Sequence, residues 1–228
     1  MIEQQNISWK SFLINWRNVL LAGICFASTI GLLMLKKSFL EFNEARKGTY
    51  LYDFFLQSIG PYDINTIIFI VTYGSICFGL VLCFLRPWIT IHLLLAITFL
   101  VTMRICTLFF FPLEAPTDII PLEDLFLKFT FYDKAPLVKD LFFSGHTASL
   151  FTLYLLNRRF KWLSSLLLFN SIVLGMMLMV QHVHYTVDIV AAFPFAFLAY
   201  FLASKVSIWL YKLNDSMDPK FESVTFRN

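Results

Sequence analysis

The chain has 228 residues, of which 58% are hydrophobic and only 14% are charged, and its mean hydropathy is +0.71. A soluble domain carries about 25% charged residues, so this composition excludes an ordinary soluble fold and indicates an integral membrane protein. The formal net charge of +3 is small, and nothing in the sequence suggests nucleic-acid binding.

The N-terminal residues 1–17 are expected to form a short helix in the membrane interface. Within them, four apolar residues fall at helical spacing: Trp9, Phe12, Leu13 and Trp16. An alternative of equal weight is that these residues are the frayed start of the first membrane span. The first long apolar run begins near Val19 and is too long for the apolar region of a secretory signal peptide, so none is expected.

Six apolar runs predict an all-α integral membrane protein with six transmembrane helices. The expected spans are residues 18–35, 65–85, 88–111, 144–157, 162–181 and 184–211. A spanning helix needs about 20 residues, so the fourth run is short, and we expect Leu141, Phe142 and Phe143 to extend it. Residues 18–212 then form one six-helix membrane domain, and residues 213–228 form a cytoplasmic tail.

Two longer loops of mixed charge separate the spans, at about residues 36–64 and 112–140. The first is expected to contain an interfacial helix within residues 51–56. In the second, Glu123 and Asp124 are candidates for contact with a cationic headgroup, and the favoured alternative is a solvated loop face. Arg104 lies near the end of the third span, where it either binds a headgroup or forms a structural ion pair.

Basic residues in the short turns predict the orientation of the chain. Arg86 and the group Arg158, Arg159 and Lys161 fall on one side under six crossings, so both termini are expected in the cytoplasm. Residues 144–147 and 182–188 then lie on the exoplasmic face, which is lumenal, periplasmic or extracellular.

The strongest chemical pattern is the pair of His184 and Asp188, four residues apart. On a helix this spacing places both side chains on one face, where the carboxylate accepts a hydrogen bond from one ring nitrogen. The other ring nitrogen is left free to act as a base or a nucleophile.

A second pattern, Ser144, Gly145, His146 and Thr147, stands where the second loop meets the fourth span. The N–H groups of a helix N-terminus suit a phosphate, Gly145 allows close approach, and the hydroxyls of Ser144 and Thr147 can add donors. His146 is then placed to protonate a leaving oxygen. Because an out-and-back pair of spans returns the chain to the same side, this pattern is expected to face His184.

Weaker candidates surround these residues. Asp140 is expected to orient His146 or to cap a helix, with equal weight, and His182 to support the site. Tyr185 either holds a phosphate oxygen or, as the safer interpretation, sits in the interfacial aromatic belt. No cofactor or metal site is expected, because no further ligand stands at suitable spacing from the two histidines, and the four cysteines show no CxxC spacing.

Residues 143–147 (FSGHT) and 182–188 (HVHYTVD) resemble the paired signatures of the sphingomyelin synthase family, a branch of the type 2 phosphatidic acid phosphatase superfamily. Residues 102–108 resemble a looser signature of the third span, and Asp53 one of the first loop. The resemblance implies a six-helix bundle of this superfamily and a catalytic triad of His146, His184 and Asp188.

The resemblance further implies that a phospho-headgroup moves from a membrane phospholipid to a ceramide-type lipid alcohol through a phosphohistidine, with diacylglycerol released. The superfamily commonly has an Arg-Pro motif before the first histidine and an Arg six residues before the second. Here the loop before His146 has no Arg-Pro and the latter position is Leu178, which favours a phosphodiester over a phosphomonoester.

Two alternatives stay open. One is a lipid phosphatase or phospholipase C-like hydrolase at the same site, and the other is a non-enzymatic lipid-handling protein. A homo-oligomer, the identity of the headgroup and the choice of membrane are also left open.

Overall fold

The computed structural model describes residues 7–122 and 137–216. Within these ranges the chain is helical, and its one β-type contact is an isolated parallel bridge between Thr49 and Leu113. The helices are α1 (Trp9–Ile14), α2 (Trp16–Glu44), α3 (Phe54–Gln57), α4 (Asn65–Phe84), α5 (Pro87–Phe110), α7 (Gly145–Leu156), α8 (Lys161–Val180) and α9 (Thr186–Ser216). The prediction of an all-α fold is therefore confirmed.

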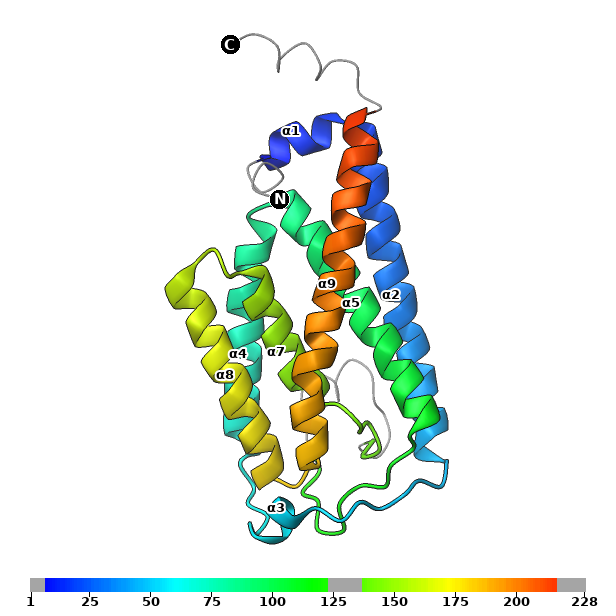
Figure 1. Ribbon diagram of the computed structural model, residues 1–228, viewed down its shortest axis with the longest axis vertical. Coiled ribbons are helices and arrows are strands. Elements are labelled where there is room, and N and C mark those ends of the chain that lie inside the picture. The colour runs from blue at the N-terminus through cyan, green and yellow to red at the C-terminus, as the bar shows by residue number, and fades with distance from the viewer. Residues whose placement is uncertain (1–6, 123–136, 217–228) are drawn as a thin grey trace.

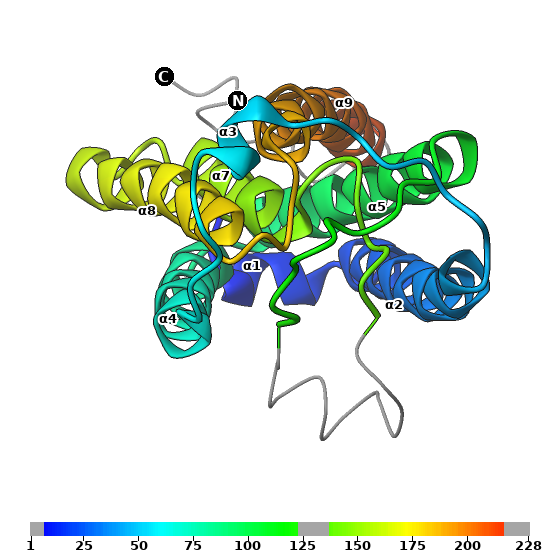
Figure 2. The ribbon, with the colours of Figure 1, turned by 90° about the horizontal axis from the view of Figure 1, so that it is seen from below.

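Five helices in the described residues are long and apolar enough to cross a membrane, namely α2, α4, α5, α8 and α9. The fourth predicted span, residues 144–157, corresponds to α7, which has only 12 residues. At a rise of 1.5 Å per residue it covers about 18 Å, less than the ~30 Å hydrocarbon core. Because α7 packs against α4, α5, α8 and α9, it lies within the bundle and is enclosed by longer helices (Figure 2).

The expected extension of this span through Leu141, Phe142 and Phe143 was wrong. The backbone of Phe142 has a φ of 78°, which is not helical, and the helix begins only after Ser144. Leu141 and Phe143 are nevertheless fully buried, and Phe143 stacks on Phe195 of α9 with 4.8 Å between ring centroids. The apolar character of this stretch therefore anchors a buried loop.

Helix α2 is longer than the span predicted at residues 18–35, since it continues to Glu44. No glycine or proline follows Leu35 until Gly48, and the intervening Lys, Leu and Glu residues favour helix. Lys36 therefore lies on a helix, whereas the prediction placed it in a loop.

At its other end α2 is separated from α1 by Asn15, whose side chain caps α2 at the N–H of Arg17. Residues 9–14 thus form a helix of their own. Their position in a membrane interface stays a prediction.

Helix α9 packs along α5 and α7, where a row of fully buried alanines allows the backbones to approach closely. The row consists of Ala192, Ala196, Ala199 and Ala203.

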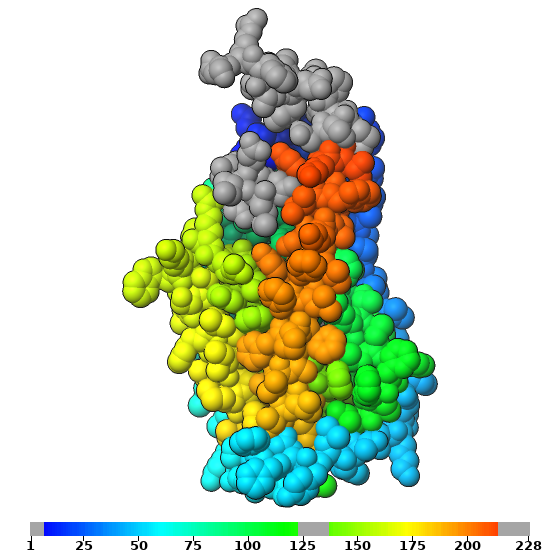
Figure 3. All heavy atoms as spheres, in the orientation of Figure 1, coloured from blue at the N-terminus to red at the C-terminus, as the bar shows by residue number. Residues whose placement is uncertain are grey.

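The helix ends fall into two groups. Helix α1 lies beside the C-terminal end of α9, while α3, the end of α2 and the start of α9 lie at the opposite end, called the loop end below (Figure 1). The loop that contains α3 spreads over this end (Figure 3). The membrane side on which either end lies stays a prediction.

Candidate active site at the loop end of the bundle

The pair of His184 and Asp188 forms at the start of α9. Nδ1 of His184 lies 3.2 Å from Oδ2 of Asp188, which also accepts the backbone N–H of Tyr185 at 3.1 Å. Asp188 is fully buried and His184 is 3% exposed. His184 stands in the turn before α9 and not on the helix as expected, yet its ring still reaches the carboxylate. With Nδ1 bonded to Asp188, Nε2 is the nitrogen that is free to react.

The first turn of α7 is joined directly to this pair. The backbone N–H of Ser144 donates to the carbonyl oxygen of Asp188 at 3.0 Å, and the Ser144 hydroxyl caps α7 by accepting the N–H of Thr147 at 3.4 Å. The two sequence patterns, although separated by α7 and α8, therefore meet as the out-and-back topology predicts.

His146 lies in this first turn of α7. It is half-buried, and within the described residues no hydrogen bond or ion pair holds its ring. The ring lies close enough to His184, Arg104 and Asp140 to interact with them electrostatically. Its ring is thus free to act as an acid–base group beside the imidazole of His184, which Asp188 holds in place.

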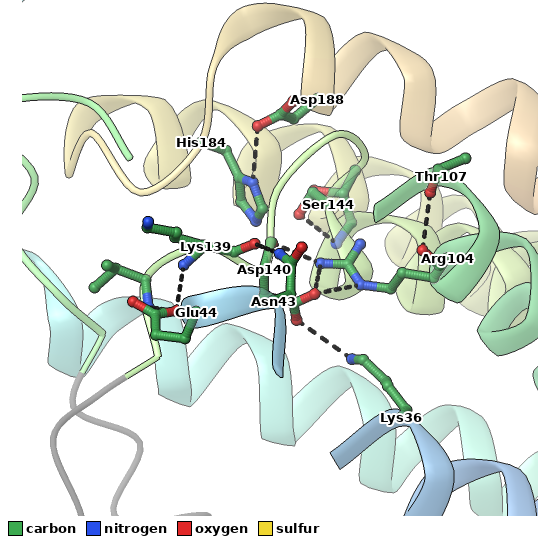
Figure 4. A network of polar contacts seen from close by, with 12 residues as sticks. Lys36, Asn43, Glu44, Arg104, Thr107, Lys139, Asp140, Ser144, His184 and Asp188 are labelled. Carbon is green, nitrogen blue, oxygen red and sulfur yellow. Dashed lines mark hydrogen bonds and ion pairs between the residues drawn. The ribbon is translucent and has the colours of Figure 1, made fainter. Parts of the chain in front are cut away.

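A cationic cluster completes the site (Figure 4). Nε of Arg104 donates to Oδ1 of Asp140 at 3.0 Å, and Nη2 donates to the Asp140 backbone carbonyl at 2.8 Å. Lys36, from α2, approaches the second carboxylate oxygen, Oδ2, at 3.3 Å. Nη1 of Arg104 is buried without a hydrogen-bond partner. Of the two roles expected for Arg104, the structural ion pair is present, and one donor is still available for a phosphate oxygen.

Asp140 remains a carboxylate in this setting. Burial by itself raises the pKa of Asp140, but the positive charges of Arg104 and Lys36 hold that pKa well below its usual range. The segment before it is fixed by Glu44, whose Oε2 accepts the backbone N–H groups of Val138 and Lys139 at 3.1 and 3.0 Å. The end of α2 thereby positions Asp140.

Gly145 is needed for close packing against Arg104. A Cβ atom at this position would lie 3.3 Å from the guanidinium carbon of Arg104, closer than most side chains tolerate. The guanidinium also lies over the ring of Phe143, 5.2 Å from its centroid. The glycine therefore allows the arginine to rest on the first turn of α7, where a phosphate was expected to approach.

Three predicted candidates make contacts with other parts of the chain. The Thr147 side chain is buried near Gly175 of α8. The Tyr185 hydroxyl donates to the carbonyl oxygen of Glu114 at 3.0 Å. His182 places Nε2 2.7 Å from the carbonyl oxygen of Ile59. These contacts give Tyr185 and His182 supporting positions between the loops. Glu123 lies outside the described residues.

Two functional positions were missed or undervalued. Lys36 was assigned to a loop, and no sequence signal indicated that it reaches Asp140 across 104 positions. Asp53 caps α9 from the first loop, since its carboxylate accepts the N–H of Thr186 at 2.6 Å and the Thr186 hydroxyl at 2.9 Å. Its cap on the local helix α3 was readable from the sequence, but its reach to α9 was not.

The position six residues before His184 does not face the site. Leu178 is fully buried in an apolar cluster with Ile68 and Leu174. In the described part of the chain, no three His, Cys, Asp or Glu side chains are grouped so that they could hold a metal ion.

Residues 139–205 match the family model described as PAP2 superfamily C-terminal. This match supports the type 2 phosphatidic acid phosphatase superfamily. The matched segment contains Asp140, His146, His184 and Asp188, while Lys36 and Arg104 lie before it. No curated protein and no solved structure matches the chain. Members of the superfamily are typically lipid phosphatases or phosphotransferases, and this chemistry agrees with the paired histidines.

Proposed function

We propose that the protein transfers a phospho-headgroup from a glycerophospholipid to a ceramide-type lipid alcohol, as in the sphingomyelin synthase branch of the superfamily. The observation that carries this proposal is the join between the two histidine patterns. Because the Ser144 N–H binds the Asp188 carbonyl, the free Nε2 of His184 and the ring of His146 are held at one end of the bundle. Two imidazoles in this arrangement suit a two-step displacement at phosphorus.

In the first step, Nε2 of His184 attacks the phosphorus of the donor lipid. The bond from phosphorus to the diacylglycerol oxygen breaks, and His146, as the imidazolium, gives that oxygen its proton. Asp188 keeps the proton of His184 on Nδ1 and balances the positive charge that develops on the ring. The products are diacylglycerol and a phosphohistidine that retains the headgroup.

In the second step, the hydroxyl of the acceptor lipid attacks the phosphorus. His146, now neutral, takes the hydroxyl proton, the phosphorus–nitrogen bond breaks, and its electron pair returns to His184. Both histidines regain their initial protonation states, so the cycle is balanced without a cofactor.

The charge of the site supports a phosphodiester donor. Arg104 and Lys36 contribute two positive charges and Asp140 removes one, so a net charge of about +1 faces the phosphate. A phosphodiester carries one negative charge, whereas a phosphomonoester carries nearly two at neutral pH. The unpartnered Nη1 of Arg104 offers the diester one charge-assisted hydrogen bond.

Hydrolysis is the second candidate, and the superfamily description favours it. In that case water replaces the acceptor alcohol in the second step, and the same residues keep their roles.

Purified protein incubated with phospholipids labelled in the acyl chains separates the two reactions. We expect diacylglycerol to appear only when ceramide is also supplied, together with a ceramide that carries the headgroup. Diacylglycerol formed without any acceptor would replace transfer with hydrolysis, and no product in either case would support the non-enzymatic alternative. A His92→Gln variant is the matched control, because His92 lies about 18 Å along α5 from Arg104 and binds the carbonyl oxygen of Tyr200.

A further inference from the structure

We infer that Asp140, paired with Lys36, is a specificity-determining group that sets the charge of the phosphate the site accepts. The inference rests on the proposed function, because it concerns the same phosphate position. It assigns to Lys36 a role that neither its sequence context nor the superfamily match suggests.

The geometry divides one carboxylate between two cations. Arg104 binds Oδ1 of Asp140 and Lys36 binds Oδ2, at 2.8 and 3.3 Å in the two ion pairs. The Arg104 side chain is 4% exposed, whereas those of Asp140 and Lys36 are 29% and 22% exposed. The carboxylate is thus partly exposed, and its charge acts on a phosphate that binds beside the cluster.

Other charges near the cluster cancel. Lys139 forms an ion pair with Glu114 at 2.9 Å and donates to the carbonyl oxygen of Arg46 at 2.8 Å. In the proposed mechanism, the negative charge of Asp188, which faces the neutral imidazole of His184, is balanced by the imidazolium of His146. The balance that remains for a phosphate is therefore set by Lys36, Arg104 and Asp140.

Asp140 then disfavours a second negative charge on the ligand. A dianionic phosphomonoester beside Arg104 Nη1 would meet a net charge of only about +1, because Asp140 cancels one of the two cations, so its second negative charge would stay uncompensated. In a partly buried site, one uncompensated charge of this kind is worth a factor of about ten or more in affinity. The monoanionic diester escapes this repulsion.

The balance can be changed in both directions. Asp140→Asn raises the net charge of the cluster from about +1 to about +2, and Lys36→Met lowers it to about 0. The double variant returns it to about +1 with neither original group present. The amide oxygen of asparagine still accepts the hydrogen bond from Arg104 Nε, so the arginine keeps its anchor. Lys205→Met is the matched control, because Lys205 is exposed and lies about 25 Å along α9 from Asp188.

The experiment measures binding of short-chain phosphatidic acid and of short-chain phosphatidylcholine to each purified variant at pH 8, where the monoester is largely dianionic. We expect the wild-type protein and Lys205→Met to prefer the diester. Asp140→Asn should shift the ratio of affinities toward the monoester by on the order of tenfold. Lys36→Met should shift it in the opposite direction, and the double variant should return it close to the wild-type value.

Equal weakening of both ligands in Asp140→Asn, or a double variant that fails to restore the ratio, would overturn the inference. Because binding is measured without an acceptor, the result does not depend on whether the second step uses ceramide or water. If the wild-type protein binds both lipids but releases diacylglycerol without ceramide, only the transferase proposal fails. A wild-type protein that binds neither lipid removes both proposals.

Discussion

The two halves of the membrane bundle contribute to the site in different ways. The half formed by α7, α8 and α9 supplies His146, His184 and Asp188, and it contains nearly all of the segment that matches a superfamily model. The half formed by α2, α4 and α5, with its loop, supplies Lys36, Arg104 and Asp53. The match to the superfamily model begins at residue 139, after these three helices.

The difference lies in how far each half reaches along the chain. The histidine pair depends on contacts within five residues and on one hairpin of helices, so a short motif can encode it. The cations depend on contacts that span 36 and 104 positions, and Asp53 reaches across 133. We therefore expect substitutions in α7, α8 and α9 to abolish the chemical step. Substitutions in α2, α4, α5 and their loop should instead alter binding, selectivity or stability.

The largest expected effect is the loss of His184. His184→Gln removes the attacking nitrogen while it leaves a side chain that can still bind Asp188, so turnover should fall by a factor of about 10³ or more. Diacylglycerol release from labelled phospholipid measures the loss, and thermal unfolding checks the fold. The control is His92→Gln in the first half, which should retain most activity. Near-normal turnover in His184→Gln would eliminate the two-histidine mechanism.

A substitution of Arg104 tests the contribution of α5 to phosphate binding. Arg104→Lys keeps the charge, but an ammonium group cannot bind Asp140 through two nitrogens and present a third donor. We expect kcat/KM to fall by about 10²-fold, with donor binding more affected than the maximal rate. Equal activity of the lysine variant would mean that only the charge of Arg104 matters.

The sequence predicted most of the fold because the apolar runs set the helices and the out-and-back topology set the meeting of the two histidine patterns. For α7 it failed only in the extension toward residue 141, where buried loop residues such as Phe143 look like part of a helix, since burial in protein and burial in lipid favour the same residue types. It failed for Lys36 because a lysine at the end of an apolar run is typical of a membrane boundary. The contact with Asp140 arises only from how α2 packs beside α5.

Substitution of Asp53 is expected to have a smaller effect. Its comparison with Asp63 separates a cap that reaches a distant helix from a local one. Asp53→Ala removes the carboxylate that caps both α3 and the start of α9, and should lower the free energy of unfolding by about 1–2 kcal/mol. Activity should fall several-fold as well, because His184 lies two residues before Thr186. Asp63→Ala is the matched variant, since Asp63 accepts the N–H of Asn65 at the start of α4. It should lower stability without a loss of kcat/KM. Equal activity losses in the two variants would show that the contact between Asp53 and α9 has no special role in activity.

The smallest expected effect is a loss of stability in acid that arises from the loops at the loop end. Burial by itself raises the pKa of Asp53, but the hydrogen bonds from the N–H groups of Thr186 and Leu56 together lower it by more, so the net shift of the pKa is downward. The pKa of Glu114 is lowered by the N–H of Gly48 and by Lys139. A carboxyl group with a lower pKa in the folded state stabilises the protein above its unfolded pKa of about 4, and this contribution is lost as the pH falls through the folded value.

Thermal unfolding in detergent between pH 7 and pH 3 tests this expectation. The wild-type protein should keep its stability down to about pH 4 and lose it below, as the carboxylates of Asp53 and Glu114 are protonated and their hydrogen bonds weaken. Asp53→Asn removes one of the titrating groups, so its curve should start lower at pH 7 and fall less steeply in acid. The ion pair of Asp118 with His182 should add little, because the Asp118 side chain is 53% exposed. Parallel curves for the wild-type protein and Asp53→Asn would show that the acid loss does not arise from Asp53.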